Sequence, residues 1–180
     1  MMRFIFLLPL TLALSAEGAP KTTRWDFENP VPRLEQGWRP STDAVMGGVS
    51  EATLRVENEP DGNRALHVTG ETRPGAALPF AGAYVSFGAR PFETVDLSGA
   101  QTLRFRLKGS TPALAVALYT EARGYVPIVR VLKPTTGWQE YRLELAAFQG
   151  LDPARVTGLA FSRSIYPGPV DFWVDDVVVE

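Results

Sequence analysis

Apolar and polar residues alternate with a period of two along most of the chain, and turns rich in glycine or proline separate the alternating stretches. The clearest example is 103–108, where Leu103, Phe105 and Leu107 alternate with basic residues. Because successive side chains of a strand project to opposite faces of a sheet, this stretch predicts a strand with one buried and one wet face.

Other stretches alternate in a similar way and predict further strands, at 52–56, 66–69, 114–119, 126–132, 138–145, 156–161 and 170–179. The first two flank a turn at 59–63 and predict a hairpin. The stretch 114–119 is apolar on both faces, which predicts a central strand. Pro127 predicts either the start of a strand or an edge strand.

Helical signals are confined to single turns near 146–148 and 152–155, where Asp152 can cap the turn and Pro153 suits its first position. Roughly ten short strands with turns at short intervals predict an all-β fold. We expect a single-domain β-sandwich of the jelly-roll type.

The N-terminus departs from this pattern. Arg3 precedes an apolar run at 4–14, and small residues follow as far as Ala19. These features predict a secretory signal peptide over 1–19 and a β-sandwich domain over 20–180. The run is about half the ~20 residues that a spanning helix needs, so we expect cleavage and no membrane insertion afterwards. The expected product is a periplasmic or secreted monomer.

Composition narrows the function classes. The chain has no cysteine, which excludes disulfides, thiolate metal sites and cysteine nucleophiles, and its net charge of −2 gives no basic surface for nucleic acid. The single histidine, His67, lies in an alternating stretch and is interpreted as a solvated strand residue. We expect no enzyme, and a pair of carboxylates is the catalytic alternative that these residues leave open.

The segment 41–50 has two interpretations. In the structural one, Gly47 and Gly48 allow a sharp turn, Asp43 caps that turn, and Met46 plugs the end of the sandwich. In the functional one, Asp43, Met46 and Ser50 form the floor of a binding cleft. The sequence leaves both open.

Three aromatic residues lie in segments rich in glycine, proline and arginine: Trp38, Tyr125 and Tyr166. Tyr125 and Tyr166 follow Arg123 and Arg163 closely, and loop aromatics beside arginine are candidates for ligand binding, since flat rings stack on sugars. The other three tryptophans lie within expected strands and are assigned to the core or the space between sheets, namely Trp25, Trp138 and Trp173.

Adjacent aspartates on the last expected strand also need an explanation, because Asp is disfavoured in strands. A structural Ca²⁺ bound by Asp175 and Glu28 is one explanation. The simpler one is a β-bulge, in which one carboxylate is exposed and the other accepts hydrogen bonds from backbone or arginine.

The string Ser-Thr-Asp-Ala-Val-Met-Gly-Gly-Val-Ser at 41–50 resembles the signature of the complex I intermediate-associated protein 30 family. Segments at 78–82, 96–109 and 138–148 resemble later segments of that family, in the required order. The resemblance covers about 25–180 and implies a galactose-binding-like jelly roll, related to carbohydrate-binding modules. The eukaryotic relatives assist assembly of respiratory complex I in mitochondria, whereas the signal peptide predicts another location for this chain.

Two functions follow as expectations. The first is a non-catalytic exported module that binds carbohydrate or a protein partner through loops at one end or face of the sandwich. The alternative is an assembly factor or chaperone for a membrane or envelope protein complex, as the family resemblance implies.

Overall fold

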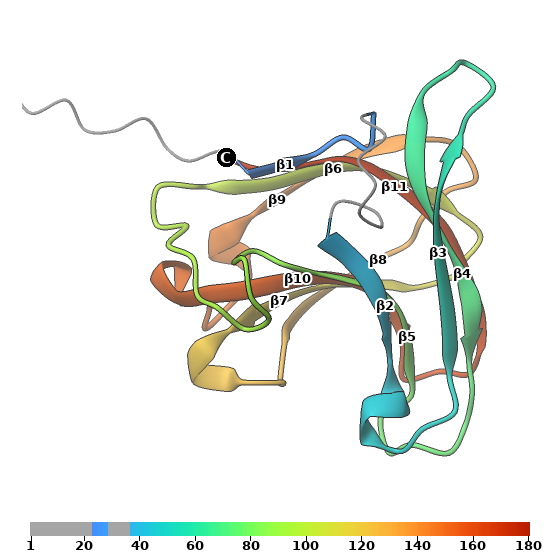
Figure 1. Ribbon diagram of the computed structural model, residues 1–180, viewed down its shortest axis with the longest axis horizontal. Coiled ribbons are helices and arrows are strands. Elements are labelled where there is room, and N and C mark those ends of the chain that lie inside the picture. Colours follow the sequence, from blue (N-terminus) through green and yellow to red (C-terminus); the bar gives the residue numbers. More distant parts are fainter. Residues whose placement is uncertain (1–22, 29–36) are drawn as a thin grey trace, which may run out of the picture.

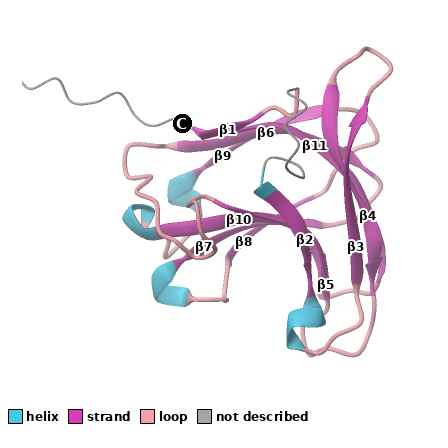
Figure 2. Cartoon of the chain, in the orientation of Figure 1, coloured by secondary structure: helices cyan, strands magenta, loops and turns pink. Residues whose placement is uncertain are grey.

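Two antiparallel β-sheets pack face to face in the computed structural model, which describes residues 23–28 and 37–180 (Figures 1 and 2). This arrangement confirms the predicted all-β jelly-roll sandwich. The predicted signal peptide at 1–19 lies outside the described residues. Among the described residues, no helix is long and apolar enough to span a membrane.

Sheet A has the order β3–β4–β11–β6–β9, with β1 paired beside β11. Its strands are β1 (Thr23–Trp25), β3 (Glu51–Asn58), β4 (Arg64–Thr72), β6 (Thr102–Gly109), β9 (Gln139–Glu144) and β11 (Gly168–Val179). The predicted hairpin is β3 and β4, which pair antiparallel around the turn 59–63.

Sheet B has the order β2–β5–β10–β7–β8. Its strands are β2 (Trp38–Thr42), β5 (Phe80–Ser86), β7 (Leu114–Thr120), β8 (Ile128–Leu132) and β10 (Val156–Ser164). As predicted, β7 is internal to the sheet, and β8 begins directly after Pro127 and lies at the edge. A proline fits there because it has no backbone N–H to donate to a neighbouring strand.

Four short 3₁₀ turns complete the described structure: η2 (Asp43–Met46), η3 (Glu121–Arg123), η4 (Leu145–Ala147) and η5 (Pro153–Arg155). Asp152 caps η5 as expected, since its carboxylate accepts a hydrogen bond from the Ala154 N–H at 3.1 Å.

The core lies between the sheets and follows the alternation of the sequence. Leu103, Phe105 and Leu107 of β6 are fully buried, while the basic residues between them are partly exposed on the outer face. Phe105 packs against Phe161 of β10, with ring centroids 4.9 Å apart. The alternating pattern therefore brings the two sheets together.

Strand register fixes which loops lie at which end of sheet B. At one end, β2 stops, β5 starts and β10 stops, because Thr42 pairs with Ala81 and Ser164 pairs with Phe80. We call this the η2 end; it carries loops 43–50, 73–79 and 165–167. At the other end, the η3 end, β5 and β7 stop and β10 starts. It carries loops 87–94, 121–127 and 148–155.

Candidate functional site

The sequence-predicted site residues do not form one site. Arg123 and Tyr125 lie at the η3 end, and the remaining loop candidates lie at the η2 end, on opposite sides of sheet B (Figure 1). Trp38 starts β2 at the η3 end of sheet B, opposite Val85, but it points into the core and not into a loop. Its expected loop position is wrong, because it starts strand β2 and is 1% exposed. The indole packs against Trp25, Phe27 and Phe161 in the core.

The most exposed aromatic surface is at the η3 end. Tyr125 is 78% exposed and Phe92 is 45% exposed, and their rings meet edge to face with centroids 5.0 Å apart. The loops meet because backbone hydrogen bonds between Val95 and Val156 fix the chain after Phe92 beside the start of β10, next to the end of β7. Phe92 has a φ of +62°, which is uncommon for a bulky residue.

Polar groups surround this aromatic pair. A hollow of about 410 Å³ beside it is lined by Arg90, Pro91, Phe92, Glu93, Thr94 and Glu121. Glu93 accepts a hydrogen bond from the Arg90 N–H at 3.0 Å and lies 3.7 Å from the Arg90 guanidinium. Glu121 forms an ion pair with Arg155. Both carboxylates beside the aromatic pair therefore have an arginine partner.

Arg123 supports the loop that carries Tyr125. Its Nε donates to the Val126 carbonyl oxygen at 3.3 Å. Phe92 was not predicted as a site residue. The available signal was the dipeptide Pro91-Phe92, an aromatic residue in a segment without strand alternation.

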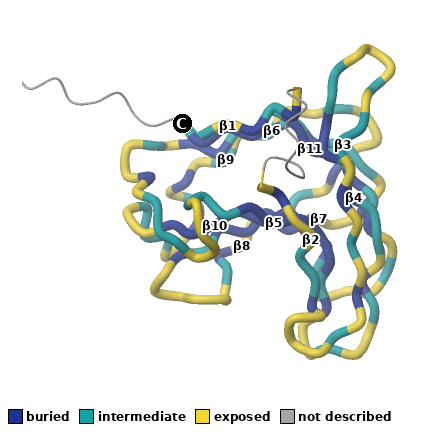
Figure 3. Tube along the Cα trace, viewed as in Figure 1, coloured by how far each residue is buried: buried dark blue, intermediate teal, exposed yellow. Residues whose placement is uncertain are grey.

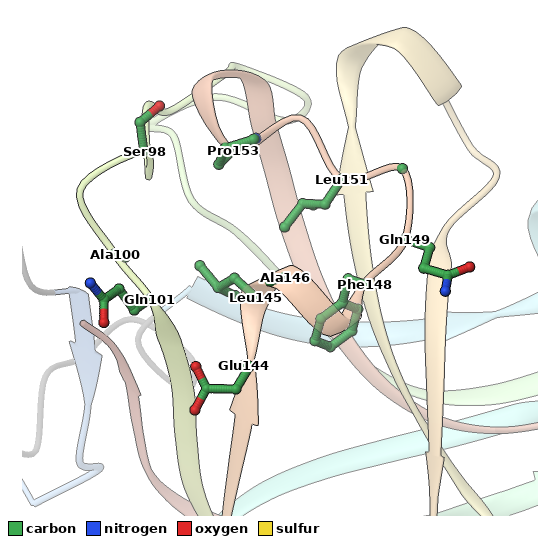
Figure 4. A pocket seen from close by; sticks show the side chains of 11 residues that line it. Ser98, Ala100, Gln101, Glu144, Leu145, Ala146, Phe148, Gln149, Leu151 and Pro153 are labelled. Atoms are coloured by element: carbon green, nitrogen blue, oxygen red, sulfur yellow. The ribbon is translucent and has the colours of Figure 1, made fainter.

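A second hollow of about 490 Å³ lies between the start of β6 and the segment that runs from the end of β9 to η5 (Figure 4). Gln101, Glu144 and Gln149 supply polar side chains, and Leu145 and Leu151 supply apolar surface. Phe148 lines it as well but is fully buried in the core. This hollow therefore offers no exposed aromatic ring.

At the η2 end, the structure supports the structural interpretation of the 41–50 segment in part. Asp43 is fully buried, and its carboxylate accepts hydrogen bonds from the Ser50 N–H at 3.0 Å and the Ser50 hydroxyl at 2.8 Å. Gly47 adopts a φ of +81° at the end of η2. Asp43 and Ser50 therefore fulfil each other's hydrogen-bonding needs inside the turn. Because both are buried there, the expectation that they form the floor of a cleft is wrong.

Met46 and Arg163 also differ from expectation. Met46 is more than half exposed and does not plug the sandwich end. Arg163 is buried, and its guanidinium donates to the carbonyl oxygens of Tyr166 at 3.0 Å and Pro167 at 2.8 Å. It supports the β10–β11 turn instead of facing solvent, whereas Tyr166 is 68% exposed.

Both carboxylates of the calcium interpretation, Asp175 and Glu28, have hydrogen-bond partners within the protein. The Asp175 carboxylate accepts from the Asp176 N–H at 2.7 Å and the Asn63 amide at 3.0 Å, and the Glu28 carboxylate accepts from the Arg64 N–H at 3.1 Å. Within 23–28 and 37–180, no three acidic or histidine side chains gather around one point.

The bulge interpretation is supported instead. The pairing of β11 with β6 is interrupted between Asp175 and Val178, and Asp176 adopts a φ of +48°. Asp176 is partly exposed and forms an ion pair with Arg24 at 2.9 Å. The buried Asp175 takes the hydrogen bonds, and burial raises the pKa of its carboxyl group.

Trp138 and Trp173 lie on the outer face of sheet A and not in the core. The position of Trp173 between inward Phe172 and Val174 was a usable signal. Lys108 lies over both indoles, 5.0 Å from the Trp138 centroid and 4.7 Å from that of Trp173. His67 stacks on Trp173 at 4.0 Å. The protein's own side chains thus contact both rings.

His67 is also fully engaged. Its Nδ1 lies 3.3 Å from a Glu57 oxygen and its Nε2 lies 2.9 Å from an Asp171 oxygen. Both ring nitrogens therefore have partners within the protein. The cluster has a structural role in holding β3, β4 and β11 together.

Solved structures similar to this chain include carbohydrate-binding modules and part of an exo-beta-agarase. One family 30 carbohydrate-binding module shares 22% identity with a TM-score of 0.58, covering 78% of this chain and 90% of that chain. CBM27-1 of Caldicellulosiruptor saccharolyticus, solved with mannohexaose, shares 12% with a TM-score of 0.56, covering 90% and 98%. An exo-beta-agarase shares 12% with a TM-score of 0.61, covering 90% of this chain and 25% of that chain.

These identities support the fold alone. A comparison with curated proteins found no match. The family model described as Complex I intermediate-associated protein 30 matches residues 25–160, three quarters of the chain. The chain therefore belongs to the complex I intermediate-associated protein 30 family.

Proposed function

We propose that this protein is a non-catalytic carbohydrate-binding module, and that Phe92 and Tyr125 at the η3 end stack on the sugar. The observation that carries this proposal is the exposed edge-to-face pair, with ring centroids 5.0 Å apart. Large aromatic surface left in water is unfavourable, so this exposed aromatic pair is a candidate binding surface.

The geometry suits a sugar ring. A pyranose has one apolar face of C–H groups and a rim of hydroxyls, so it needs a flat ring beneath it and hydrogen-bonding groups at its edge. Tyr125 supplies the ring. Arg90, Glu93 and Glu121 line the adjoining hollow and supply donors and acceptors for hydroxyls.

The carboxylates beside the aromatic pair are suited to ligand binding. Glu93 and Glu121 each face an arginine, Arg90 and Arg155 respectively. A carboxylate has more acceptor sites than one arginine uses, so both groups can also accept hydrogen bonds from the hydroxyls of a ligand.

We further propose that the protein works outside the cytoplasm, in the periplasm or secreted, after removal of the predicted signal peptide. The similar solved structures support polysaccharides as the first ligands to test. Mannan is the first choice because CBM27-1 was solved with mannohexaose. Agarose and cellulose follow, because an exo-beta-agarase and a CBM29-2 variant solved with cellulohexaose are also similar in fold.

The test is retention on insoluble mannan, cellulose and agarose, together with affinity electrophoresis in soluble polysaccharide. Tyr125→Ala and Phe92→Ala should each weaken binding by about tenfold, since truncating an aromatic anchor costs roughly 1–2 kcal/mol. Tyr166→Ala is the matched control, because Tyr166 is 68% exposed and lies at the opposite end. Binding that survives both variants, or is lost equally with the control, would refute the site.

Family membership supports a second function, assistance in the assembly of a membrane or envelope protein complex. This function needs a protein-binding surface and no sugar site. Crosslinking in intact cells followed by purification should then enrich one membrane or envelope complex. If the purification recovers only abundant proteins, while the same protein preparation still binds polysaccharide, the assembly function is not supported.

A further inference from the structure

The η2 end carries six large apolar side chains that lie in water. They are 56–83% exposed and come from three loops: Val45, Met46 and Val49, then Leu78, then Ile165 and Tyr166. We call this group the apolar tip. Figure 3 shows the η2 turn as exposed, at the foot of β2 and away from the sheets.

The three loops are neighbours because each crosses between the sheets at the same end. Loop 43–50 joins β2 to β3, loop 73–79 joins β4 to β5, and loop 165–167 joins β10 to β11. In sheet B the strands β2, β5 and β10 lie side by side. The loops also contact one another: Arg73 N–H donates to the Ser50 hydroxyl at 3.0 Å, and Ile165 N–H donates to the Pro79 carbonyl at 2.9 Å.

The tip is held in place from below. The buried Asp43 carboxylate fixes the first loop through Ser50, and the buried Arg163 guanidinium fixes the third through the carbonyls of Tyr166 and Pro167. Groups that are locked by buried hydrogen bonds do not fold inward to hide apolar surface. The first and third loops, which carry five of the six side chains, are therefore anchored by buried hydrogen bonds.

The loops are also free of charge at their outer surface. Residues 44–49 and 74–79 contain only apolar residues, glycine and proline, and the Tyr166 hydroxyl is the single polar side-chain group in 165–168. Asp43 and Arg163 face inward. Arg73, at the base, is bound by Glu51 and Glu71 at 2.9 Å each.

This composition discriminates between partners. A protein interface carries about one hydrogen bond per 100–200 Å² and a polar rim, which gives it specificity. The tip has one polar side-chain group and cannot supply such a pattern. A lipid bilayer needs no such pattern, since it accepts apolar side chains of any shape and favours tyrosine at its surface.

The sequence alone predicted no membrane insertion after signal cleavage; from the exposed loops we propose instead that the apolar tip inserts into the surface layer of a lipid bilayer, without spanning it, and anchors the protein peripherally. Because the tip is neutral, its binding should not require anionic lipid and should change little with salt. The attachment should be reversible, as expected for a few side chains that reach the acyl boundary. This proposal is independent of the sugar site at the η3 end.

The test uses the absence of native cysteine. Met46→Cys and Val126→Cys, in the full chain, are each labelled with an environment-sensitive nitrobenzoxadiazole dye; Val126 is 59% exposed and lies at the η3 end. On vesicles of pure phosphatidylcholine, the dye at position 46 should brighten at least twofold and be quenched by doxyl-labelled lipid. The dye at 126 should not respond, even if the N-terminus itself binds lipid.

Two outcomes would overturn the proposal. Equal responses at both positions would indicate non-specific adsorption. If the dye at position 46 does not respond to vesicles but does respond to solubilised envelope proteins, the tip binds a protein partner instead.

A second measurement compares vesicle flotation of Val45→Asp with that of Val126→Asp. The first should reduce the bound fraction at least fivefold and the second should not; equal reductions would refute the tip. Tyr125→Ala should float like the unaltered protein. A failure of the sugar site is therefore distinguishable from a failure of the tip.

Discussion

Asp43 and Gly48 occupy one small space in the η2 end. The Asp43 carboxylate is fully buried and both its oxygens accept hydrogen bonds from Ser50. A Cβ atom at position 48 would overlap that carboxyl group. Gly48 is therefore required by the side chain beside it. Gly47 has a different reason, because its φ is +81° and no atom lies within 4 Å of where its Cβ would be.

This difference predicts opposite results in two double-mutant cycles. Gly48→Ala should destabilise the protein by about 1–3 kcal/mol through overpacking, and Asp43→Ala should remove much of that cost. The two changes should then be non-additive by at least about 0.5 kcal/mol. Gly47→Ala should cost about 1 kcal/mol through backbone strain and add to Asp43→Ala. Urea unfolding measures all five variants, and additivity for Gly48 would contradict the proposed overlap.

Asp175 gives a prediction in pH. Burial raises the pKa of its carboxyl group above the ordinary 3.8, and hydrogen bonds from Asn63 and the Asp176 N–H offset this only in part. The folded chain therefore holds the proton more tightly than the unfolded chain. The resulting stability is present in full below pH 3.8 and is lost as pH rises through the folded-state pKa.

Asp175→Asn removes this titration while keeping a group of the same shape. The difference in unfolding free energy between variant and unaltered protein should shift in favour of the variant as pH rises from below 3.8 to neutrality. Urea unfolding across this range is the measurement. A difference that stays constant, or shifts the other way, would show that the buried carboxyl group does not titrate as argued.

At the scale of elements, the β3–β4 turn is fastened to the far side of sheet A. The Glu59 carboxylate, almost fully buried, accepts from the Lys108 ammonium of β6 and from the Trp138 indole N–H at 3.3 Å. Lys108 in turn lies over Trp138 and Trp173. One carboxylate thus joins the hairpin to β6 and to the chain entering β9.

Glu59→Ala should destabilise the protein by about 3 kcal/mol, because it leaves the Lys108 ammonium without a partner in a largely buried place. Glu59→Ala combined with Lys108→Met should cost clearly less than the sum of the single changes. Hydrogen exchange should accelerate most at the 58–64 end of the hairpin. Uniform acceleration over both sheets would argue that Glu59 does not act as a local fastening.

The sequence predicts most of these elements because alternation is a local signal. The stretches around Leu103, Leu114 and Val170 form β6, β7 and β11, and most of their apolar residues are buried. The predictions for Trp38 (loop) and Trp173 (core) were wrong for related reasons, because each relied on the residue type and its flanking residues more than on its position in the alternating pattern of a strand. Trp38 is the first residue of an edge strand and faces the core. Trp173 lies between two inward-facing residues of β11, so its side chain points to the outer face of the sheet.

The candidate sites were less predictable, because they depend on strand order. Phe92 and Tyr125 are 33 residues apart and meet only because β5, β10 and β7 are neighbours. No local pattern encodes that order. The same holds for the three loops of the apolar tip, whose shared lack of charge was visible in the sequence while their proximity was not.

On the scale of the whole molecule, the two proposed surfaces lie at opposite ends of sheet B. Between them the sheet is packed against the core through buried residues such as Phe161 and Leu118, and it therefore acts as a rigid spacer. Neither surface contains a residue of the other. The protein is therefore expected to bind lipid and polysaccharide at the same time and independently, since two sites on one rigid body couple only through differential contacts.

This expectation is measurable as bridging. Fluorescent phosphatidylcholine vesicles should be retained on the insoluble polysaccharide that the protein binds, and only when the protein is present. Tyr125→Ala and Val45→Asp should each abolish retention, the first by releasing the polysaccharide and the second by releasing the vesicle. Because Tyr166 lies in the tip, Tyr166→Ala should weaken bridging by weakening vesicle binding, while polysaccharide binding stays unchanged. Val131 is an exposed valine on the edge strand β8, so Val131→Asp is the control and should leave bridging intact. If both single-site variants still bind their remaining ligand normally but the unaltered protein never bridges, the two ends cannot be occupied together, and the independence argued from the rigid sheet is wrong.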